Sequence, residues 1–222
     1  SRCAPSPETQ QGAAPHGGIP CILACGPEQK ATIALTREQP DGSALCFLSQ
    51  HIGDVENGET FDAWHEARHR MSSLFELEPH ALACDLHPTY LSSQWARAEA
   101  SAEGRPLVEV QHHHAHIASV IAEMAARGII GPAEQVLGIA LDGTGAGTDG
   151  TVWGGEVMVA SLSGFTRMAH LKPWRLPAGM ASVRDARRNA FSLLHSCELL
   201  NHPGARTLVE GLSEAERAVT AT

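Results

Sequence analysis

The sequence lacks any apolar run approaching the roughly 20 residues that cross a lipid bilayer. It also lacks a charged segment followed by an apolar one near its start, so we expect no secretory signal. Basic residues are scarce, because 16 lysines and arginines stand against 25 acidic residues and give a net charge of −9. A nucleic-acid backbone attracts a basic surface. The composition therefore argues against a membrane protein and against DNA or RNA as the main partner.

Cysteines spaced as in a disulfide-rich fold are also missing. The six cysteines are scattered through the chain, mostly inside apolar segments. Small disulfide scaffolds instead concentrate their cysteines in loop-rich chains. We interpret these cysteines as buried thiols in a reducing cytoplasm, where we expect the protein to be localised. None of them has neighbours in sequence that would activate a thiol as a nucleophile.

What is present is the composition of an ordinary globular protein, with 43% hydrophobic and 18% charged residues in a chain of 222. Such a chain can bury one large core or the cores of two small lobes. Residues 1–19 show no apolar period and are rich in Pro, Gly, Ala and Gln. This segment is predicted to be a flexible linker.

Short apolar segments alternate with segments of helical periodicity along the rest of the chain. Strands are predicted at residues 21–26, 31–36, 43–50, 81–88, 106–110 and 166–174, with strand, glycine-rich turn and strand over 134–162. Helices are predicted at residues 59–77, 91–104, 116–128 and 182–200, and the remainder to Thr222 is polar and contributes little to a core. This order predicts an α/β fold.

The opening strand–turn–strand, followed later by a second one, resembles the two-lobed plan of actin-like (ASKHA-type) ATPases. On that plan, residues 20–130 form the first lobe with the histidine cluster. Residues 131–222 form the start of a second lobe, which would be truncated.

Helical periodicity also predicts which side chains face the core. In the helix at residues 59–77, the predicted buried face carries Phe61, Trp64, Met71, Leu74 and Phe75. In the helix at residues 116–128, it carries Ile117, Val120, Ile121 and Met124.

Four histidines cluster where a predicted strand gives way to a helix, in the sequence VQHHHAHIASV. His112 and His116 are four residues apart, so they can direct both rings at one metal ion if the helix starts early enough. Asp142 ends an apolar strand, and in open α/β sheets ligands bind at that end. Histidine and carboxylate ligands suit iron or zinc. In the metal hypothesis, His113 and His114 are supporting or substrate-facing groups rather than ligands. The alternative hypothesis is that His112–His114 only cap the helix and form local hydrogen bonds.

A rival motif, HEARH at residues 65–69, has the spacing of a helical zinc-protease site. Its flanks are rich in charge, and Phe61 and Trp64 mark the buried side of that helix. We therefore interpret His65 and His69 as lying towards the edge of the helix or towards solvent.

A glycine-rich loop connects the predicted strands of residues 134–162. Glycines let backbone N–H groups approach phosphate oxygens, and a threonine adds a hydroxyl donor. The candidate nucleotide-contacting residues are Asp142, Gly143, Thr144, Gly145, Gly154 and Gly155. The alternative is a plain β-hairpin with Asp-Gly turns. Because Asp142 is also a candidate metal ligand, we favour phosphate contact over a plain hairpin.

Four motifs together resemble one family: CFLSQHIGD, ACDLHPTYLSSQWA, VQHHHAHIASV and IALDGTGAGTDGTVWGGE. They look like the carbamoyltransferase domain of HypF, a [NiFe]-hydrogenase maturation protein. That domain is similar to the TsaD-type proteins that make threonylcarbamoyladenosine and to antibiotic O-carbamoyltransferases. The resemblance covers most of the chain from about Pro20 onwards, with the motifs in the family's order.

The resemblance implies a reaction and its partners. An adenylating domain, absent from this chain, would make carbamoyl-adenylate from carbamoyl phosphate and ATP. The actin-like domain would pass the carbamoyl group to the C-terminal cysteine of the partner HypE. That group would supply the cyanide ligands of the [NiFe]-hydrogenase active-site iron.

The resemblance also implies roles for residues. His112, His116 and Asp142 match metal ligands, and the glycine loop matches phosphate loops. Lys30 falls near the first phosphate-binding turn, and we assign catalytic roles to Lys30, His113 and His114.

This chain departs from the family at three positions. Met180 stands where the family has an aspartate, and Ala186 and Arg187 replace a Pro-Trp pair. Two alternatives therefore remain: a related O-/N-carbamoyl or threonylcarbamoyl transferase, and a catalytically incompetent metal- or nucleotide-binding module. An incomplete second lobe would expose apolar strand surface, which predicts self-association.

Overall fold

The computed structural model describes residues 20–176 and 185–221. These residues form two compact units, which divide between His170 and Leu171. The predicted linker at residues 1–19 and the departure at Met180 lie outside the described residues.

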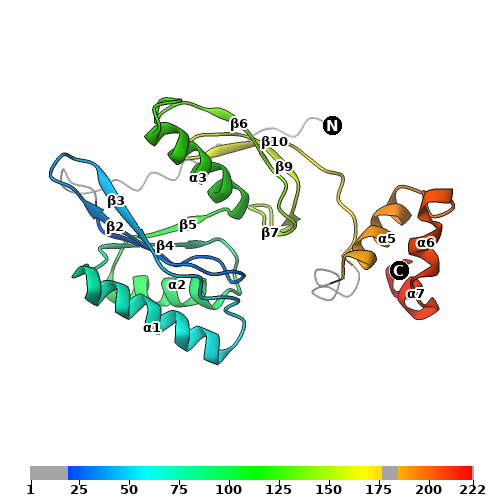
Figure 1. The fold of residues 1–222 in the computed structure, drawn as a ribbon, viewed down its shortest axis with the longest axis horizontal. Coiled ribbons are helices and arrows are strands. Elements are labelled where there is room, and N and C mark those ends of the chain that lie inside the picture. Colours follow the sequence, from blue (N-terminus) through cyan, green and yellow to red (C-terminus); the bar gives the residue numbers. More distant parts are fainter. Residues whose placement is uncertain (1–19, 177–184, 222) are drawn as a thin grey trace. The chain divides into compact units, whose positions relative to one another are not determined.

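The first unit is built on a five-stranded sheet with the strand order β3-β2-β1-β4-β5 (Figure 1). Its strands are β1 (Ile22–Ala24), β2 (Ala34–Glu38), β3 (Ala44–Leu48), β4 (Ala81–Asp85) and β5 (Leu107–Val110). The first three pair antiparallel, whereas β1, β4 and β5 run parallel. Helices α1 (Gly58–Phe75) and α2 (Leu91–Glu103) cover one face of this sheet, as Figure 1 shows. The predicted order of these strands and helices is confirmed.

Helix α1 begins at a capping box, in which the Asn57 side chain accepts the backbone N–H of Thr60. Its indole at Trp64 is fully buried and donates a hydrogen bond to the carbonyl of Cys25 at 3.0 Å. The prediction that Leu74 faces the core is wrong, because its side chain is 76% exposed. At 3.6 residues per turn, Leu74 lies roughly 80° around the helix from Trp64. The buried stripe is therefore narrower than the sequence suggested.

A second, three-stranded sheet packs on helix α3 (His112–Ala126). Its antiparallel strands are β6 (Val136–Ala140), β9 (Glu156–Ala160) and β10 (Phe165–His170). Ile117 and Ile121 of α3 are buried against this sheet, and Gly138 allows the close approach of Ile117. Val120 is 55% exposed, which corrects its predicted burial, because it lies about 100° around the helix from Ile121.

The outer face of the second sheet carries exposed apolar side chains, at Leu137, Ile139 and Leu141. This is the kind of surface from which self-association was predicted, and self-association itself stays a prediction. The expected lobe boundary at residues 130 and 131 also stays a prediction. Within the described residues the chain is compact up to His170, because α3 packs on β6 and β9 beyond that boundary.

The second unit is helical, and its first helix lies within the helix predicted at residues 182–200. It contains α5 (Ala186–Ser196), a 3₁₀ turn (Pro203–Ala205), α6 (Arg206–Glu210) and α7 (Glu214–Ala221). Phe191, Ala205 and Leu212 are buried. Helix α7 is preceded by Ser213, whose hydroxyl and N–H both bond the carboxylate of Glu216. This Ser-x-x-Glu signal was present in the sequence and was missed.

The cysteines only partly follow the prediction. Cys21, Cys25 and Cys84 are buried, whereas Cys46 and Cys197 are exposed, and all five are free thiols. Cys46 lies on β3, the edge strand of the five-stranded sheet, where alternate side chains face outwards. No helix among the described residues is long and apolar enough to cross a membrane.

Gly26 follows β1 with a left-handed φ of 71°, and a Cβ there would lie 2.2 Å from the carbonyl oxygen of Thr32. We expect Gly26→Ala to lower the free energy of unfolding by about 3 kcal/mol, from backbone strain and overpacking. Gly42 is a matched control, because its φ is 80° but nothing lies within 4 Å of the added Cβ. Gly42→Ala should cost about 1 kcal/mol. Urea denaturation measures the free energy of unfolding of both variants. Equal decreases would show that the backbone at Thr32 shifts to accommodate the added Cβ.

Burial should also decide which thiols react. Burial raises the pKa of the Cys25 and Cys84 thiols, so few thiolates exist there at pH 8. We expect Cys46 and Cys197 to be alkylated at pH 8 in the native protein, and Cys25 and Cys84 only after denaturation. Peptide mapping by mass spectrometry measures each site. Alkylation of native Cys25 at the rate of Cys46 would contradict the buried assignment.

Candidate metal centre

The candidate site lies at the carboxyl edge of the parallel strands. Strand β4 ends at Asp85, and β5 leads through Gln111 directly into α3, of which His112 is the first residue. Because β4 and β5 run parallel, these two ends meet at the same edge of the sheet. Helix α3 begins four residues earlier than predicted, at His112 rather than His116. Both histidines therefore stand on one face, one turn apart.

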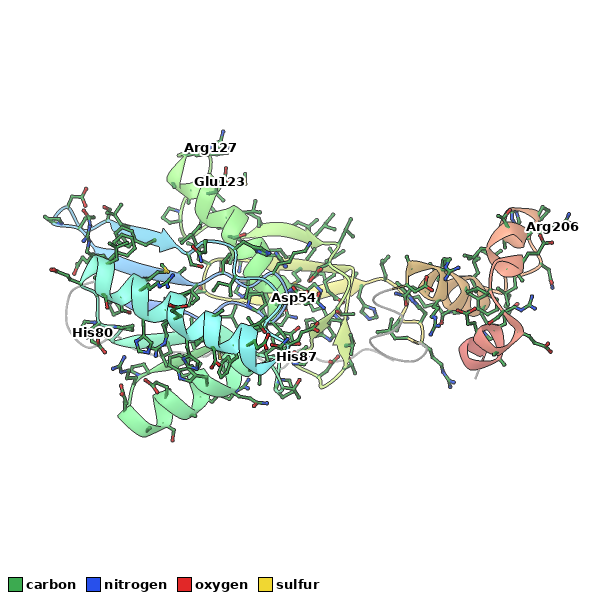
Figure 2. The ribbon with its side chains drawn as sticks, turned by 60° about the horizontal axis from the view of Figure 1, so that its bottom comes forward. Asp54, His80, His87, Glu123, Arg127 and Arg206 are labelled. Atoms are coloured by element: carbon green, nitrogen blue, oxygen red, sulfur yellow. The ribbon has the colours of Figure 1, made fainter. Side chains whose placement is uncertain are left out.

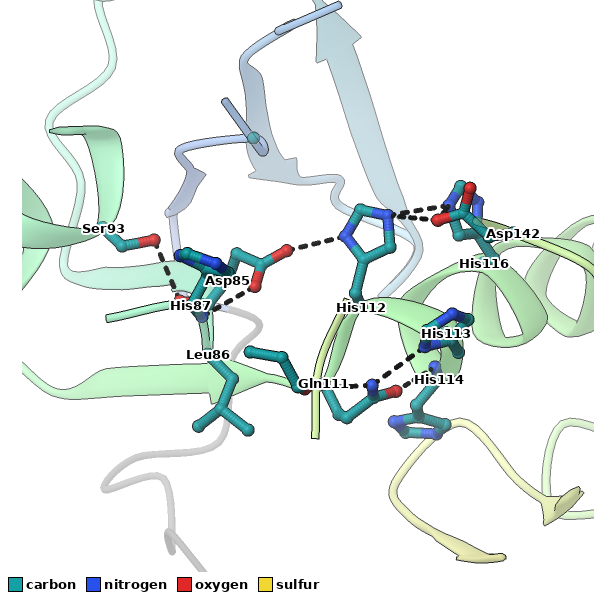
Figure 3. A network of polar contacts seen from close by, with 12 residues as sticks. Asp85, Leu86, His87, Ser93, Gln111, His112, His113, His114, His116 and Asp142 are labelled. Atoms are coloured by element: carbon teal, nitrogen blue, oxygen red, sulfur yellow. Dashed lines mark hydrogen bonds and ion pairs between the residues drawn. The ribbon is translucent and has the colours of Figure 1, made fainter. Parts of the chain in front are cut away.

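His112, His116 and Asp142 bring three potential ligand atoms together (Figure 3). The Nε2 atom of His112 lies 3.2 Å from Nε2 of His116 and 2.9 Å from Oδ2 of Asp142. The third side of this triangle, between His116 and Asp142, measures 3.7 Å. Bonds of about 2.0–2.1 Å to a tetrahedral metal would place ligand atoms about 3.3 Å apart. The three side chains therefore fit one divalent ion and leave a coordination position open.

The rival motif forms no such group. Among the described residues, His112, His116 and Asp142 are the one set of three potential ligands found close together. His69 is exposed as predicted, but His65 is half-buried, with its ring against those of Trp64 and Trp95. The rings packed against His65 are aromatic and offer no metal ligand, and its half-buried position agrees with the prediction that it lies towards the edge of the helix.

Asp85 is a member of the site that sequence reasoning missed. Its Oδ2 accepts a hydrogen bond from Nδ1 of His112 at 2.7 Å, and its Oδ1 accepts the N–H of His87 at 2.8 Å (Figure 3). The hydrogen bond to Asp85 raises the pKa of His112. A carboxylate on Nδ1 fixes the ring and its tautomer, which leaves Nε2 for a metal. Asp85 ends an apolar strand as Asp142 does, so the criterion that selected Asp142 would also have selected Asp85.

His113 and His114 are buried and bonded within the protein. The Gln111 amide nitrogen lies 3.1 Å from Nδ1 of His113, and the Gln111 oxygen accepts the N–H of His114 (Figure 3). His114 Nε2 donates to the carbonyl of Ser161 at 2.9 Å. Burial lowers the pKa of His113, which favours its neutral form. These contacts favour a positioning role over direct contact with a substrate, and the catalytic assignment of both histidines stays a prediction.

Lys30 lies on the turn after β1, at the same edge of the sheet. Its backbone has a left-handed φ of 51°, and its N–H donates to Oδ1 of Asp54 at 2.8 Å. Its ammonium group is exposed and makes no ion pair or hydrogen bond within the described part of the chain. The structure therefore fixes the main chain of Lys30, and its predicted catalytic role stays a prediction.

The glycine loop contains a small hairpin, formed by β7 (Gly145–Ala146) and β8 (Val152–Trp153). Asp149 and Gly150 make its turn, in which Asp149 accepts hydrogen bonds from Thr151. The hairpin hypothesis is therefore confirmed for this part of the loop.

The predicted phosphate donors of the loop are largely engaged. The N–H groups of Gly143 and Gly155 bond the Oδ1 atom and the carbonyl of Asp142, and that of Gly154 bonds Glu156. Gly145 pairs with Trp153 in the hairpin. The Thr144 hydroxyl has no protein partner among the described residues, and phosphate contact stays a prediction.

The Asp85 carboxylate can be tested without disturbing the turn that it caps. We expect Asp85→Asn to weaken zinc affinity about 10- to 100-fold, because the amide cannot hold His112 as a carboxylate does. Asp41 is a matched control, since it likewise accepts the N–H of the residue two positions on, Ser43, at 2.9 Å. Titration calorimetry with Zn²⁺ compares the variants. Equal affinities for the native chain, Asp85→Asn and Asp41→Asn would remove Asp85 from the centre.

Two family models and several known proteins are similar to this chain over most of its length. The family model described as the HypF Kae1-like domain matches residues 18–123, and a model of the second subdomain of the Kae1-like carbamoyltransferase domain matches residues 138–221. Carbamoyltransferase HypF2 of Cupriavidus necator is 40% identical over 177 residues, which cover 80% of this chain and 21% of that protein. Carbamoyltransferase HypF of Synechocystis is 38% identical over 173 residues, covering 78% of this chain and 21% of that protein.

Solved structures agree with the sequence matches. The crystal structure of full-length HypF in the phosphate- and nucleotide-bound form matches with a TM-score of 0.73 at 37% identity, covering 91% of this chain and 24% of that one. The structure of T. kodakarensis HypF matches with a TM-score of 0.66 at 32% identity, covering 80% of this chain and 22% of that one.

These matches confirm the predicted α/β, actin-like fold class, to which Kae1-like domains belong. The chain spans about a fifth of the length of the curated relatives named above. The two family models match successive parts of the chain and leave residues 124–137 between them. The chain belongs to the family of Kae1-like carbamoyltransferase domains of HypF.

Proposed function

We propose that this chain provides the carbamoyl-transfer site of a HypF-type protein. In the proposed reaction, a cysteine thiolate attacks the carbamoyl carbon of carbamoyl-adenylate. A C–S bond forms, the C–O bond to the adenylate phosphate breaks, and AMP leaves. The donor would come from carbamoyl phosphate and ATP through an adenylating domain, and the acceptor would be the C-terminal cysteine of HypE. The phosphate- and nucleotide-bound form of the solved HypF supports a nucleotide donor.

The observation that carries this proposal is the ligand triangle of His112, His116 and Asp142. His116 and Asp142 are 58% and 39% exposed, so the triangle opens to solvent and to a substrate. A divalent iron or zinc ion bound there would act as a Lewis acid that polarises the carbamoyl carbonyl. Asp85 holds the ring of His112, and the Thr144 hydroxyl, close in sequence to Asp142, can donate to an oxygen of the donor.

The cysteines of the chain agree with an external nucleophile. Burial raises the pKa of Cys25 and Cys84, the cysteine after β1 and the one on β4, so their thiols stay protonated and inaccessible near neutral pH. These two cysteines of the parallel strands are therefore unsuited as nucleophiles, which favours a thiolate supplied by a partner. A flexible chain terminus that ends in cysteine can reach an open site of this kind.

The proposal predicts transfer that depends on the triangle. With carbamoyl-adenylate and HypE supplied, we expect the native chain to add one carbamoyl group to the C-terminal cysteine, seen by mass spectrometry of HypE. His112→Ala and Asp142→Ala should lower the rate at least about 100-fold, since a lost ligand removes both metal and carbonyl polarisation.

His80 is the matched control for these variants. It is exposed and precedes β4, at the end of that strand remote from His87 (Figure 2). His80→Ala should transfer at the native rate. Metal content, measured on the same samples, should approach one equivalent in the native chain and His80→Ala alone. Metal binding without any transfer would instead support the hypothesis of an incompetent binding module, and transfer to a small hydroxyl would support an O-carbamoyltransferase.

A further inference from the structure

An ion pair next to the glycine loop joins the fully buried Glu156, at the start of β9, to the partly exposed Arg167 on β10. Arg167 Nε donates to Oε2 of Glu156 at 2.6 Å, and Nη2 donates to Oε1 at 2.9 Å. Glu156 is fully buried, and the Arg167 guanidinium stacks on the ring of Trp153 at 4.0 Å. Trp153 in turn donates through Nε1 to Asp149, at the turn of the hairpin. The pair thus ties two strands to the hairpin.

Stability alone does not account for this pair. Removing the Glu156 carboxylate from water carries a desolvation penalty that its attraction to Arg167 often only balances, and a well-packed apolar pair is frequently as stable. Glu156 uses its charge for a further purpose, because Oε1 also accepts the backbone N–H of Gly154 at 3.0 Å. The carboxylate therefore fixes the direction of the Gly154 peptide as well as the guanidinium.

The peptide that Glu156 fixes lies directly against the main chain of Asp142. A Cβ on Gly154 would approach the carbonyl oxygens of Gly143 and Asp142 to 2.4 and 3.2 Å. The N–H of Gly155 donates to the carbonyl of Asp142 at 3.3 Å. Contacts of this kind leave the main chain at Asp142 little freedom to shift while Gly154 stays in place.

Asp142 is the one ligand candidate that is not carried by α3. Its side chain accepts the N–H of Gly143 on Oδ1, while Oδ2 faces Nε2 of His112. The distance between the carboxylate and the two histidines is therefore set by where the 142–143 peptide sits relative to the helix. A change of about 1 Å in that distance is enough to impair a metal or catalytic site.

We propose that Glu156 and Arg167 are positioning residues for the metal centre. They hold the Gly154–Gly155 peptide against Asp142, and through it they hold the Asp142 carboxylate in register with His112 and His116. This inference rests on the proposed metal centre and extends it to an ion pair that contacts no ligand atom.

An apolar replacement of the pair separates positioning from stability. The double variant Glu156→Leu with Arg167→Met keeps volume and burial but cannot accept the N–H of Gly154. We expect it to fold, to bind Zn²⁺ about 10- to 100-fold more weakly in titration calorimetry, and to exchange the amides of residues 142–156 faster. Arg167→Lys keeps the charge but loses the two-point contact, and we expect a weakening of about tenfold.

The control is another arginine that bonds a carboxylate, at the opposite edge of the first sheet. Arg105 donates to Glu78 at 2.8 Å, next to the start of β4 and β5, and Arg105→Lys should leave zinc affinity and amide exchange at 142–156 unchanged.

Native zinc affinity and native exchange in the double variant would overturn the inference while leaving the metal centre in place. If the double variant does not fold, Arg167→Lys decides by the same two measurements. A native chain that binds no zinc would overturn the metal centre and this inference together.

Discussion

The parallel pairing of β4 with β5 is the constraint on which the candidate metal centre depends. Asp85 is the register partner of Val110, so the ends of both strands meet and Asp85 reaches His112 across 27 residues of sequence. Because side chains alternate between the faces of a strand, a slip of one residue would turn Asp85 to the other face of the sheet. His112 would then lose the carboxylate that orients its ring.

Several of the polar side chains buried in the first unit lie near this centre. Asp85, Gln111, His113, His114 and Glu156 are buried, as are Ser92 and Ser93 on α2. Asp85 bonds His112, Gln111 bonds the first turn of α3, and Glu156 bonds the N–H of Gly154. A buried polar group without a partner destabilises a fold, so such networks fix geometry only where they are well satisfied. The apolar clusters supply the stability, and the hydrogen bond to Asp85 orients the ring of His112, one of the three candidate ligands.

Much of the fold and part of the site could be predicted from local pattern. The order of strands and helices follows from apolar periodicity. Helical spacing made the pairing of His112 with His116 possible, and the start of α3 at His112 decided it. Leu74 and Val120 were predicted to be buried but are exposed. Each helix contacts its neighbour along a stripe that is narrower than the apolar face of the sequence pattern. Asp85 was missed because its partner, His112, belongs to a different element, and no local spacing connects them.

The sequence by itself determined the α/β class, the position of the glycine-rich loop between two strands, and His112, His116 and Asp142 as candidate ligands of one metal. It did so because these depend on periodicity and chemistry within a few residues. Only the tertiary structure decided that the loop N–H groups are mostly engaged, that His113 and His114 are buried, and that Glu156 bonds both Arg167 and the N–H of Gly154. Those features depend on the register between strands far apart in the chain, which is set by packing of the whole unit.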